Sequence, residues 1–253
     1  MNLLLLREHE VRDDGRTSVT GRRARHLIDV LGAAPGRTLR AGLIDGPLGT
    51  AEVIAVAADR VQLHCTFEAT APTRADDTLL LAVPRPKVLR RCTEQAAALG
   101  FGRIVLLRTW RVDKSHLQSH TLDLDRLTHH LLLGLEQAQR TCLPTIHLAP
   151  RFRPFLEDEL EAVVPHGNRF VAHPSGEFDT ASADVDRAAP ITLAIGPERG
   201  FTDYEVDRLR DFGFVCVRAG LHPQRVETAI ALVFGQLDLR RTQSRVRATR
   251  GPG

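Results

Sequence analysis

Short apolar runs alternate with stretches of helical periodicity along the chain after residue 77. The apolar runs predict strands at Leu79–Val83, Arg103–Leu107, Thr145–Leu148, Arg169–Ala172, Ile191–Ile195 and Phe214–Val217. The helical spacing predicts helices at Val88–Leu99 (closed by Gly100), Leu122–Ala138 and Pro154–Val163. Strands and helices that alternate in this way favour an α/β fold, in which a mostly parallel sheet carries helices on both faces.

The region before residue 69 has a different pattern, with short β-rich runs separated by turn signals. The runs are Arg37–Ala41, Ala51–Ala57 and Val61–Phe67, with turns expected at Asp45-Gly46 and Ala58-Asp59. We expect a small β-barrel with a helix, Arg22–Leu31, packed on it. The polar stretch Ala69–Asp77, which includes Pro72, interrupts both patterns. The sequence therefore predicts two domains, residues 1–72 and 73–253.

Composition is compatible with a globular enzyme and excludes few functions. The chain has 253 residues, of which 43% are hydrophobic, enough for a sizeable core. It has no apolar run long enough to cross a membrane, and Met1–Leu6 is too short for a signal peptide. A cytoplasmic protein without a membrane partner is the expectation. The four cysteines are widely spaced, so neither a metal site nor a disulfide framework is expected.

The net charge is only +3, but the cations are unevenly distributed. Basic stretches occur at residues 12–40, at 85–114 and in the tail 240–253, which has five arginines and no acid. Clusters of this kind can follow a phosphate backbone, as in RNA binding. The alternative is that each cluster is an ordinary solvated surface.

The segment Ile191–Ala231 contains two glycine-marked loops, each of which follows a short strand and precedes a helix. In the first, Gly196 and Gly200 permit close backbone approach or positive φ, and Thr202 is a predicted N-cap with Glu205 as its capping-box partner. The second loop begins at Gly220 and leads into a helix that Glu227 opens. Open α/β sheets bind ligands at the carboxyl ends of their strands, so the sequence predicts a nucleotide-type ligand site here.

These loops contain Gly196-Pro197-Glu198-x-Gly200-Phe201, Glu205, Gly220, Arg225 and Glu227-Thr228-Ala229. In order and spacing, they resemble the signature loops of the RsmE-type 16S ribosomal RNA uridine-N3 methyltransferases of the SPOUT superfamily. The resemblance extends upstream through Pro86-Lys87, the helix end Glu94 to Gly100, Glu136-Gln137, Arg140, Pro144 and His173-Pro174. In the N-terminal region it includes His26, Val30-Leu31, Gly36 and Asp45-Gly46.

The chain departs from the family pattern in three places. Arg199 replaces a glycine, His222-Pro223-Gln224-Arg225 replaces an Arg-Ile-Leu-Arg run, and Gly32 replaces an arginine. Cofactor contacts in such loops are largely main-chain contacts and can survive these changes. Substrate contacts are more sensitive to these three substitutions.

The resemblance implies a C-terminal SPOUT α/β domain with a trefoil knot and a small N-terminal PUA-like β-barrel domain that binds RNA. It also implies S-adenosylmethionine as cofactor, 16S ribosomal RNA or the small ribosomal subunit as partner, and a homodimer. The implied cofactor-binding residues are His173, Ile195, Gly196, Glu198, Gly200, Ala219, Gly220, Leu221, Val226 and Thr228. The implied substrate-binding residues are Arg22, Arg25, Lys87, Arg111, Arg199 and His222.

Arg225 is the candidate catalytic residue, because it occupies the family position in the second loop. A uridine N3 must lose its proton before it can accept a methyl group, and the negative charge then spreads onto the carbonyl oxygens. A fixed arginine stabilises such charge. The alternative is that Arg225 forms an ion pair with Glu198 or Glu227 and only holds the loop.

Two other functions remain open at this point. One is an RNA-binding or assembly protein that has kept the fold without catalysis. The other is a methyltransferase with a different acceptor, another RNA or a small molecule, which the altered segment His222–Gln224 allows. Trp110, in a loop after a predicted strand, also has two interpretations: contact with RNA or packing within the protein.

Overall fold

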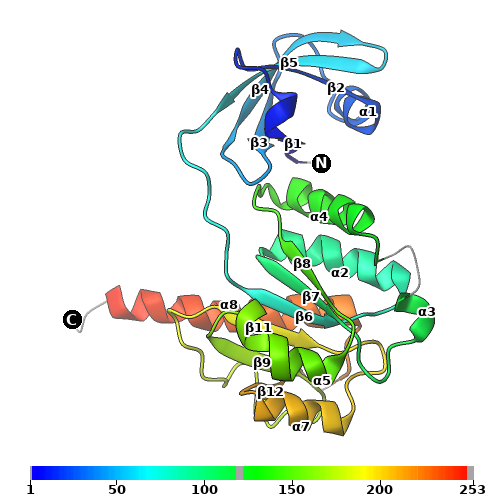
Figure 1. The fold of residues 1–253 in the computed structure, drawn as a ribbon. Coiled ribbons are helices and arrows are strands. Elements are labelled where there is room, and N and C mark those ends of the chain that lie inside the picture. Colours follow the sequence, from blue (N-terminus) through cyan, green and yellow to red (C-terminus); the bar gives the residue numbers. More distant parts are fainter. Residues whose placement is uncertain (1, 118–121, 221, 250–253) are drawn as a thin grey trace. The chain divides into compact units, whose positions relative to one another are not determined.

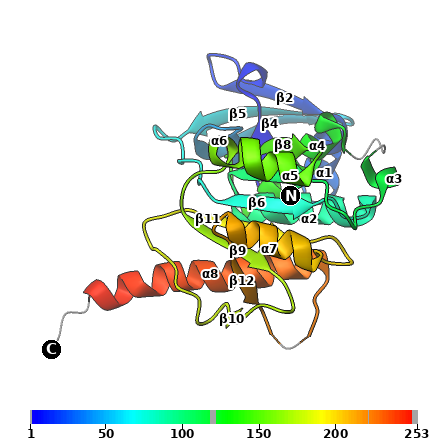
Figure 2. The same ribbon diagram turned by 60° about the horizontal axis from the view of Figure 1, so that its bottom comes forward.

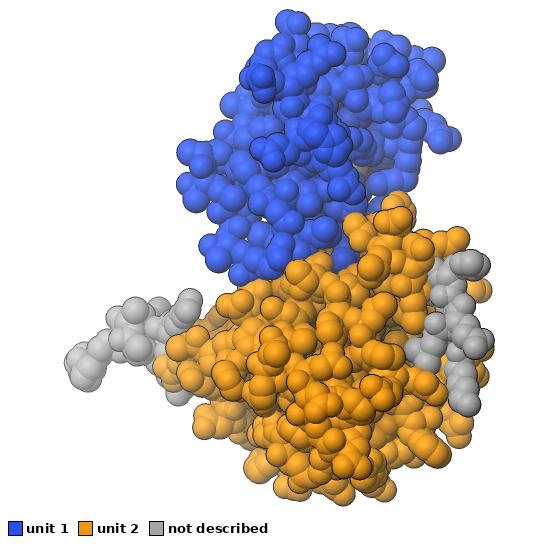
Figure 3. Space-filling model, in the orientation of Figure 1, with its two compact units in different colours: residues 1–74, 131–143 blue, residues 75–130, 144–253 orange. Residues whose placement is uncertain are grey.

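The computed structural model describes residues 2–117, 122–220 and 222–249 (Figures 1 and 2). It divides into two compact units (Figure 3). Unit 1 consists of Met1–Arg74 and Leu131–Leu143, and unit 2 of Ala75–His130 and Pro144–Gly253. Each unit has its own sheet.

Unit 1 contains a curled sheet of five strands in the order β1-β3-β4-β5-β2 (Figure 1). The strands are β1 (Leu4–Leu6), β2 (Arg16–Thr20), β3 (Thr38–Leu43), β4 (Leu48–Ala57) and β5 (Arg60–Phe67). Only the β1–β3 pair is parallel among these strands. Buried and exposed residues alternate along β5, as expected for a strand that covers a core with one face. That core includes Leu4, Leu6, Val19, Leu27, Val53, Val61 and Leu63.

The helix expected at Arg22–Leu31 is present as α1 (Gly21–Asp29), and the short 3-10 helix Glu8–Glu10 precedes β2. Leu27 and Ala24 face the core from α1. The β-rich pattern therefore predicted the three long strands and the helix correctly. It did not predict β1, which has three residues, or β2, whose sequence Arg-Thr-Ser-Val-Thr is mostly polar.

Residues 131–143 join unit 1, although the boundary expected from sequence assigns them to the C-terminal domain. The Thr141 hydroxyl donates to the Gly46 carbonyl at 2.7 Å, and the Leu143 amide donates to the Asp45 carboxylate at 2.9 Å. A Cβ on Gly42 would lie 2.6 Å from the Thr141 methyl carbon, so glycine is needed for this approach.

Unit 2 contains a seven-stranded sheet in the order β10-β12-β9-β11-β6-β7-β8, and every adjacent pair is parallel. The strands are β6 (Thr78–Ala82), β7 (Arg103–Leu107), β8 (Thr145–Ala149), β9 (Asn168–Ala172), β10 (Phe178–Asp179), β11 (Ile191–Ile195) and β12 (Val215–Arg218). The expectation of an α/β fold with a parallel sheet is confirmed. The two-residue strand β10 was not predicted.

Helices lie on both faces of this sheet (Figures 1 and 2). The helices of unit 2 are α2 (Pro86–Leu99), α3 (Lys114–Leu117), α5 (Phe152–Pro154), α6 (Leu160–Val163), α7 (Asp203–Asp211) and α8 (Val226–Thr249). A further helix, α4 (Leu124–Ala138), begins in unit 2 and continues into unit 1. A π-helical turn, Phe155–Glu159, joins α5 to α6, so the helix expected at Pro154–Val163 is one irregular segment. α2 ends at Gly100 with φ of 92°, as predicted. No described helix is long and apolar enough to cross a membrane.

The strand order brings together segments that are distant in sequence. After β9 the chain reaches β10 at the sheet edge and then returns to β11, beside β6. It next forms β12, which lies between β9 and β10. Since all these strands are parallel, the loops that follow β9, β11 and β12 leave the same edge of the sheet.

The C-terminal helix α8 is attached to the start of the sheet by one ion pair. The Arg241 guanidinium donates to both Asp77 carboxylate oxygens, at 2.7 and 2.9 Å, and this hydrogen bonding raises the pKa of Arg241. Asp77 is only 5% exposed and also accepts the Ile191 amide at 2.7 Å. Arg240 donates to the Ala181 carbonyl. Two of the five tail arginines thus have contacts within the protein.

Candidate functional site

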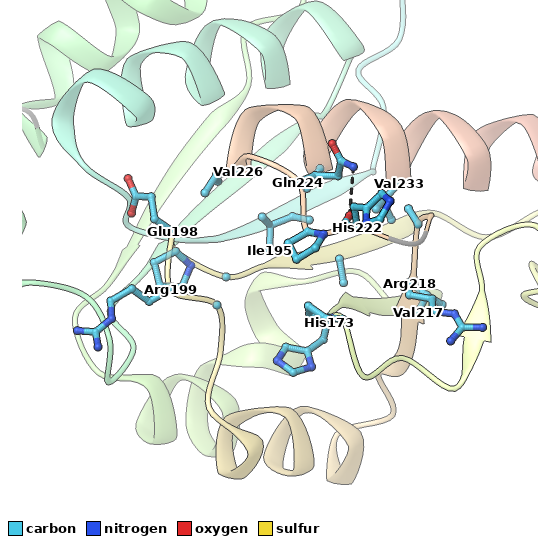
Figure 4. Close-up of a pocket in the computed structure, with 18 of the residues that line it drawn as sticks. His173, Ile195, Glu198, Arg199, Val217, Arg218, His222, Gln224, Val226 and Val233 are labelled. Atoms are coloured by element: carbon cyan, nitrogen blue, oxygen red, sulfur yellow. Dashed lines mark hydrogen bonds between the residues drawn. The ribbon is translucent and has the colours of Figure 1, made fainter.

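A cavity of about 450 Å³ lies at the carboxyl ends of β9, β11 and β12 (Figure 4). Its size falls within the range of small-molecule sites. The cavity is lined by Arg111, Ala172, His173, Pro174, Ile195, Gly196, Pro197, Glu198, Arg199, Gly200, Val217, Arg218, Ala219, Gly220, His222, Pro223, Gln224, Val226, Ala229 and Val233. The position agrees with the ligand site predicted from the two glycine loops.

Glycine is required in the loop after β11 for two different reasons. A Cβ on Gly196 would lie 2.8 Å from the Phe201 nitrogen and 3.0 Å from the Gly200 carbonyl carbon. Both are main-chain atoms, which cannot move aside without distorting the loop. Gly200 has φ of +70°, in the left-handed region. The loop can therefore turn tightly and present its main chain to the cavity.

Side chains from other elements hold this loop in place. The Glu198 carboxylate accepts the Arg85 amide at 2.9 Å, at the N-terminus of α2, where negative charge is favoured. The Arg111 guanidinium donates to the carbonyls of Arg199, at 2.6 Å, and Phe201, at 3.1 Å. Glu198 and Arg111 thus fix the loop, and both also line the cavity.

The predicted capping box at the start of α7 is confirmed. The Thr202 hydroxyl accepts the Glu205 amide at 3.2 Å, and the Glu205 carboxylate accepts the Thr202 amide at 2.8 Å. Glu205 is 2% exposed, and its other oxygen accepts the Trp110 amide at 2.6 Å. The Trp110 side chain is 87% exposed, so the packing interpretation of this residue is wrong.

The loop after β12 forms the opposite side of the cavity. Gly220 has φ of +80°, and a Cβ there would meet no atom within 4 Å. The Gln224 side-chain amide donates to the His222 carbonyl at 3.1 Å (Figure 4). Below the loops, Ile195, Val217 and Val226 supply an apolar floor. An apolar floor with exposed main-chain groups suits a ligand that has a flat heterocycle and polar edges.

Most of the residues predicted to bind a cofactor line the cavity. They are His173, Ile195, Gly196, Glu198, Gly200, Ala219, Gly220 and Val226. Thr228 is exposed on α8 and is absent from the lining, and Leu221 lies outside the described residues. The sequence analysis missed Ala229 and Val233, although with Val226 they have the i, i+3, i+7 spacing of one helix face.

The residues predicted to bind substrate lie in separate places. Arg111, Arg199 and His222 line the cavity, and Lys87 is exposed in the first turn of α2. The other two belong to α1 in unit 1. They are Arg22, which pairs with Glu136 at 3.4 Å, and the exposed Arg25.

Arg225 is exposed and stands between Gln224 and Val226, but it is not itself a lining residue. The ion pair proposed as its alternative role is not formed. Glu227 pairs with Arg91 at 3.3 Å, and Glu198 accepts the amide at the start of α2. Among the described residues, then, neither acid engages the Arg225 guanidinium.

No group of described His, Cys, Asp and Glu residues could hold a metal ion. The burial of Cys92 raises the pKa of its thiol, so this residue, near Glu227 and Glu198, is a poor nucleophile. The polar groups that line the cavity are main-chain groups, the side chains of Arg111, Arg199 and Arg218, those of Glu198 and Gln224, and the histidines His173 and His222.

Comparisons with known proteins agree on one class. A family described as "RNA methyltransferase domain" matches residues 71–238. A protein from Treponema pallidum named ribosomal RNA small subunit methyltransferase E is 30% identical over 240 residues, which are 90% of this chain and 87% of that protein. A relative named ribosomal RNA small subunit methyltransferase E 1, from Borreliella burgdorferi, is 23% identical over 90% of this chain and 94% of its own length.

Solved structures show the same fold. A ribosomal RNA small subunit methyltransferase E from Neisseria gonorrhoeae, bound to S-adenosyl methionine, superposes with a TM-score of 0.73 at 18% identity. The match covers 95% of this chain and 97% of the other.

Proposed function

This chain belongs to the RNA methyltransferase family, and we propose that it is an S-adenosylmethionine-dependent methyltransferase that modifies N3 of a uridine in 16S ribosomal RNA. The observation that carries the proposal is the cavity at the carboxyl ends of β9, β11 and β12, which lies within the region matched by the family. The relatives named above supply the class of substrate.

The residues present fit the proposed cofactor. Gly196 allows a turn that any Cβ would block, and Gly220 leaves open space where a side chain would project. Main-chain groups of these loops and of Ala219 would hold the polar edges of an adenosine, and Ile195 and Val226 would contact its flat faces. His173, Glu198, Gly200, Leu221 and Thr228 complete the proposed set. When bound, S-adenosylmethionine supplies a methyl group on a sulfonium, which an in-line displacement transfers.

Within this proposal, Arg225 stabilises the negative charge on the uracil oxygens as N3 loses its proton. The support is that Arg225 is exposed beside the cavity and that neither Glu198 nor Glu227 engages it. Glu198 holds the first loop against α2 and is not assigned the role of base. Arg111, Arg199 and His222 are the proposed substrate contacts at the cavity, with Lys87, Arg22 and Arg25 as further RNA contacts.

The proposal includes a trefoil knot in the C-terminal domain, residues 73–253. The strand order supports it, because β12 lies between β9 and β10 although the chain forms β9 and β10 first. In the proposed knot, the C-terminal part of the chain passes inside the connection that runs from β9 through β10 to β11. Loops threaded in this way are rare in proteins.

Residues 1–72 are proposed to form a PUA-like RNA-binding domain, which the curled sheet and the arginines of α1 support. A homodimer and a cytoplasmic location, where ribosomal RNA is found, belong to the same proposal. Light scattering of the purified protein would test the dimer, since a mass near the 28.0 kDa of one chain would contradict it.

Two measurements test the proposed function. S-adenosylhomocysteine should bind in isothermal titration calorimetry and raise the melting temperature by mass action. Mass spectrometry of nucleosides from 16S ribosomal RNA should show 3-methyluridine in cells with the gene and its loss in cells without it. Absence of cofactor binding at millimolar ligand would overturn the methyltransferase assignment. Cofactor binding with an unchanged amount of 3-methyluridine would overturn only the assignment of a 16S ribosomal RNA uridine as the acceptor.

A further inference from the structure

The chain has one tryptophan and one tyrosine, and both are exposed, on two segments that a hydrogen bond joins. Trp110 follows β7 and is 87% exposed, and Tyr204 lies in the first turn of α7 and is 57% exposed. Large aromatic side chains usually bury most of their surface, because burial is their main contribution to stability. Two exposed rings on segments that are bonded to each other therefore point to a ligand.

The main chain that carries these rings is firmly held. The buried Glu205 carboxylate accepts the Trp110 amide at 2.6 Å, and Glu205 directly follows Tyr204. Arg111, the next residue after Trp110, donates to the carbonyls of Arg199 and Phe201. These bonds join the loop after β7 to the loop after β11, so both rings have fixed attachment points.

Two exposed arginines lie close to Trp110 along these bonded segments: Arg111 directly follows it, and Arg199 is on the loop that Arg111 contacts. Both arginines line the cavity, so the segments that carry the rings reach its rim. The Arg199 guanidinium extends away from the other lining side chains (Figure 4). Two exposed acids lie in the same segments, Asp203 next to Tyr204 and Asp113 three residues after Trp110. The core of a protein–protein interface is depleted of charge, whereas an aromatic ring among arginines is typical of proteins that bind single-stranded nucleic acid.

We propose that Trp110 and Tyr204 form a base-stacking surface for single-stranded RNA at the rim of the cavity. Nucleotides beside the acceptor stack on the two rings, while Arg199 contacts the phosphate backbone and the acceptor base enters the cavity. This assignment rests on the proposed function, because it takes RNA as the substrate. Trp110 and Tyr204 are positioning residues for RNA and contribute nothing to cofactor binding.

The tryptophan itself supplies the first test. Since the chain has no other tryptophan, fluorescence excited at the tryptophan wavelength reports on this site alone. A mixed-sequence single-stranded RNA of about 12 nucleotides, a length within the range of such sites, is titrated in the presence of S-adenosylhomocysteine. We expect the emission to be quenched and to saturate at the same RNA concentration as the anisotropy of a labelled copy of that RNA.

Variants supply the second test. Trp110→Ala should weaken RNA affinity by about 5- to 100-fold, the range of one base–aromatic stack, and Tyr204→Ala should weaken it less. Trp110→Phe and Tyr204→Phe keep a ring and should recover most of the affinity. With methyl transfer as readout, KM for RNA should rise while kcat at saturating RNA stays unchanged. Leu148→Ala, which removes an exposed apolar side chain on β8, is the matched control and should change neither.

The outcomes separate this inference from the proposed function. If RNA binds but leaves the emission unchanged, and Trp110→Ala binds RNA as tightly as the original protein, the stacking surface is refuted and the methyltransferase assignment stands. If S-adenosylhomocysteine binds but no RNA does, both the surface and the RNA substrate are refuted. If Trp110→Ala alters the mass in sedimentation without altering RNA affinity, Trp110 contacts a second copy of the chain and the inference is wrong.

Discussion

Gly220 and Gly213 have nearly the same backbone conformation but different surroundings. Their φ angles are +80° and +81°, and a Cβ on either would meet no atom within 4 Å. Only Gly220 lines the cavity, whereas Gly213 follows α7. The pair therefore separates the effect of left-handed strain from the effect of filling the ligand site.

We expect Gly220→Val and Gly213→Val to lower the free energy of unfolding by similar amounts, about 1–2 kcal/mol or slightly more, because both place a side chain in the left-handed region. Only Gly220→Val should abolish binding of S-adenosylhomocysteine in calorimetry. Equal cofactor affinity in the two variants would mean that the cofactor does not use this side of the cavity.

Arg225 can be tested as a catalytic group without much interference from folding, since it is exposed and neither Glu198 nor Glu227 engages it. Arg225→Ala should lower the single-turnover rate by about 10²-fold, the typical effect of removing one charge-stabilising donor. Arg225→Lys keeps the charge but loses the planar fork and should recover only part of the rate.

The melting temperature and the S-adenosylhomocysteine affinity of the Arg225 variants are the controls and should stay close to those of the original protein. A variant that turned over normally at saturation but melted early would assign Arg225 to loop structure. The catalytic arginine would then have to be sought at Arg199 or Arg111.

Among single residues, the sequence predicted best the roles that depend on the residue's own backbone conformation. Gly196, Gly200 and Thr202 were identified because turns and helix caps require particular residue types. The exposure of Trp110 and the amide contact of Glu198 could not be predicted, because both depend on an element far away in sequence.

A buried acid, Asp77, joins α8 to the start of β11. Asp77 binds both Arg241 and the amide that begins β11, so Asp77→Ala leaves two donors without an acceptor. We expect the free energy of unfolding, measured by urea denaturation, to fall by about 2–4 kcal/mol. This value is at the lower end of the range for broken buried ion pairs, because Arg241 is partly exposed.

Asp238→Ala is the matched control for this element. Asp238 also pairs with Arg241, at 2.6 Å, but is 42% exposed. Its removal should change the free energy of unfolding by about 0.5 kcal/mol or less, as for other surface ion pairs. If the two variants were equally stable, the Asp77 contact would not anchor the helix.

Apolar strands were predicted well, and very short or mostly polar ones poorly. β7 and β11 have the predicted bounds, and β12 is shifted by one residue from the expected Phe214–Val217. β1 and β10, which are very short, and the mostly polar β2 were missed, since such strands owe their existence to the neighbours they pair with. The same dependence on context explains the π-helical turn within the predicted helix at Pro154–Val163.

For the whole molecule, the basic tail should contribute to RNA affinity through the arginines beyond the ion pair at Asp77. Deleting residues 243–253 removes Arg245, Arg247 and Arg250 and keeps Arg240 and Arg241 in place. RNA affinity is measured by fluorescence anisotropy at several salt concentrations. Each phosphate contact on a single strand contributes about 0.7 to the slope of log affinity against log salt, so the loss of three arginines should make this slope shallower by up to about 2.

Cofactor affinity is the control for this truncation and should not change, because α8 keeps its contacts to the sheet. A deletion beginning at Arg240 would be unsuitable, since it also breaks the ion pair with Asp77. An unchanged salt slope would show that the tail is an ordinary chain end without a role in RNA binding.

The sequence by itself determined the class of fold, the order of the longer strands and helices after residue 77, and the two loops that line the cavity. Apolar runs, helical spacing, glycines and capping residues act over a few neighbouring residues, so they can be interpreted without knowing what lies beside them. The family resemblance rests on the same local loops, which is why it identified the correct family.

Only the tertiary structure decided which segments meet. The insertion of β12 between β9 and β10, the joining of residues 131–143 to unit 1 and the contact between Glu205 and Trp110 all connect residues that are distant along the chain. Strand order follows from the packing of many side chains at once, and no local pattern records it. The cavity and the exposed aromatic rings exist because that order brings separate loops to the same edge of the sheet.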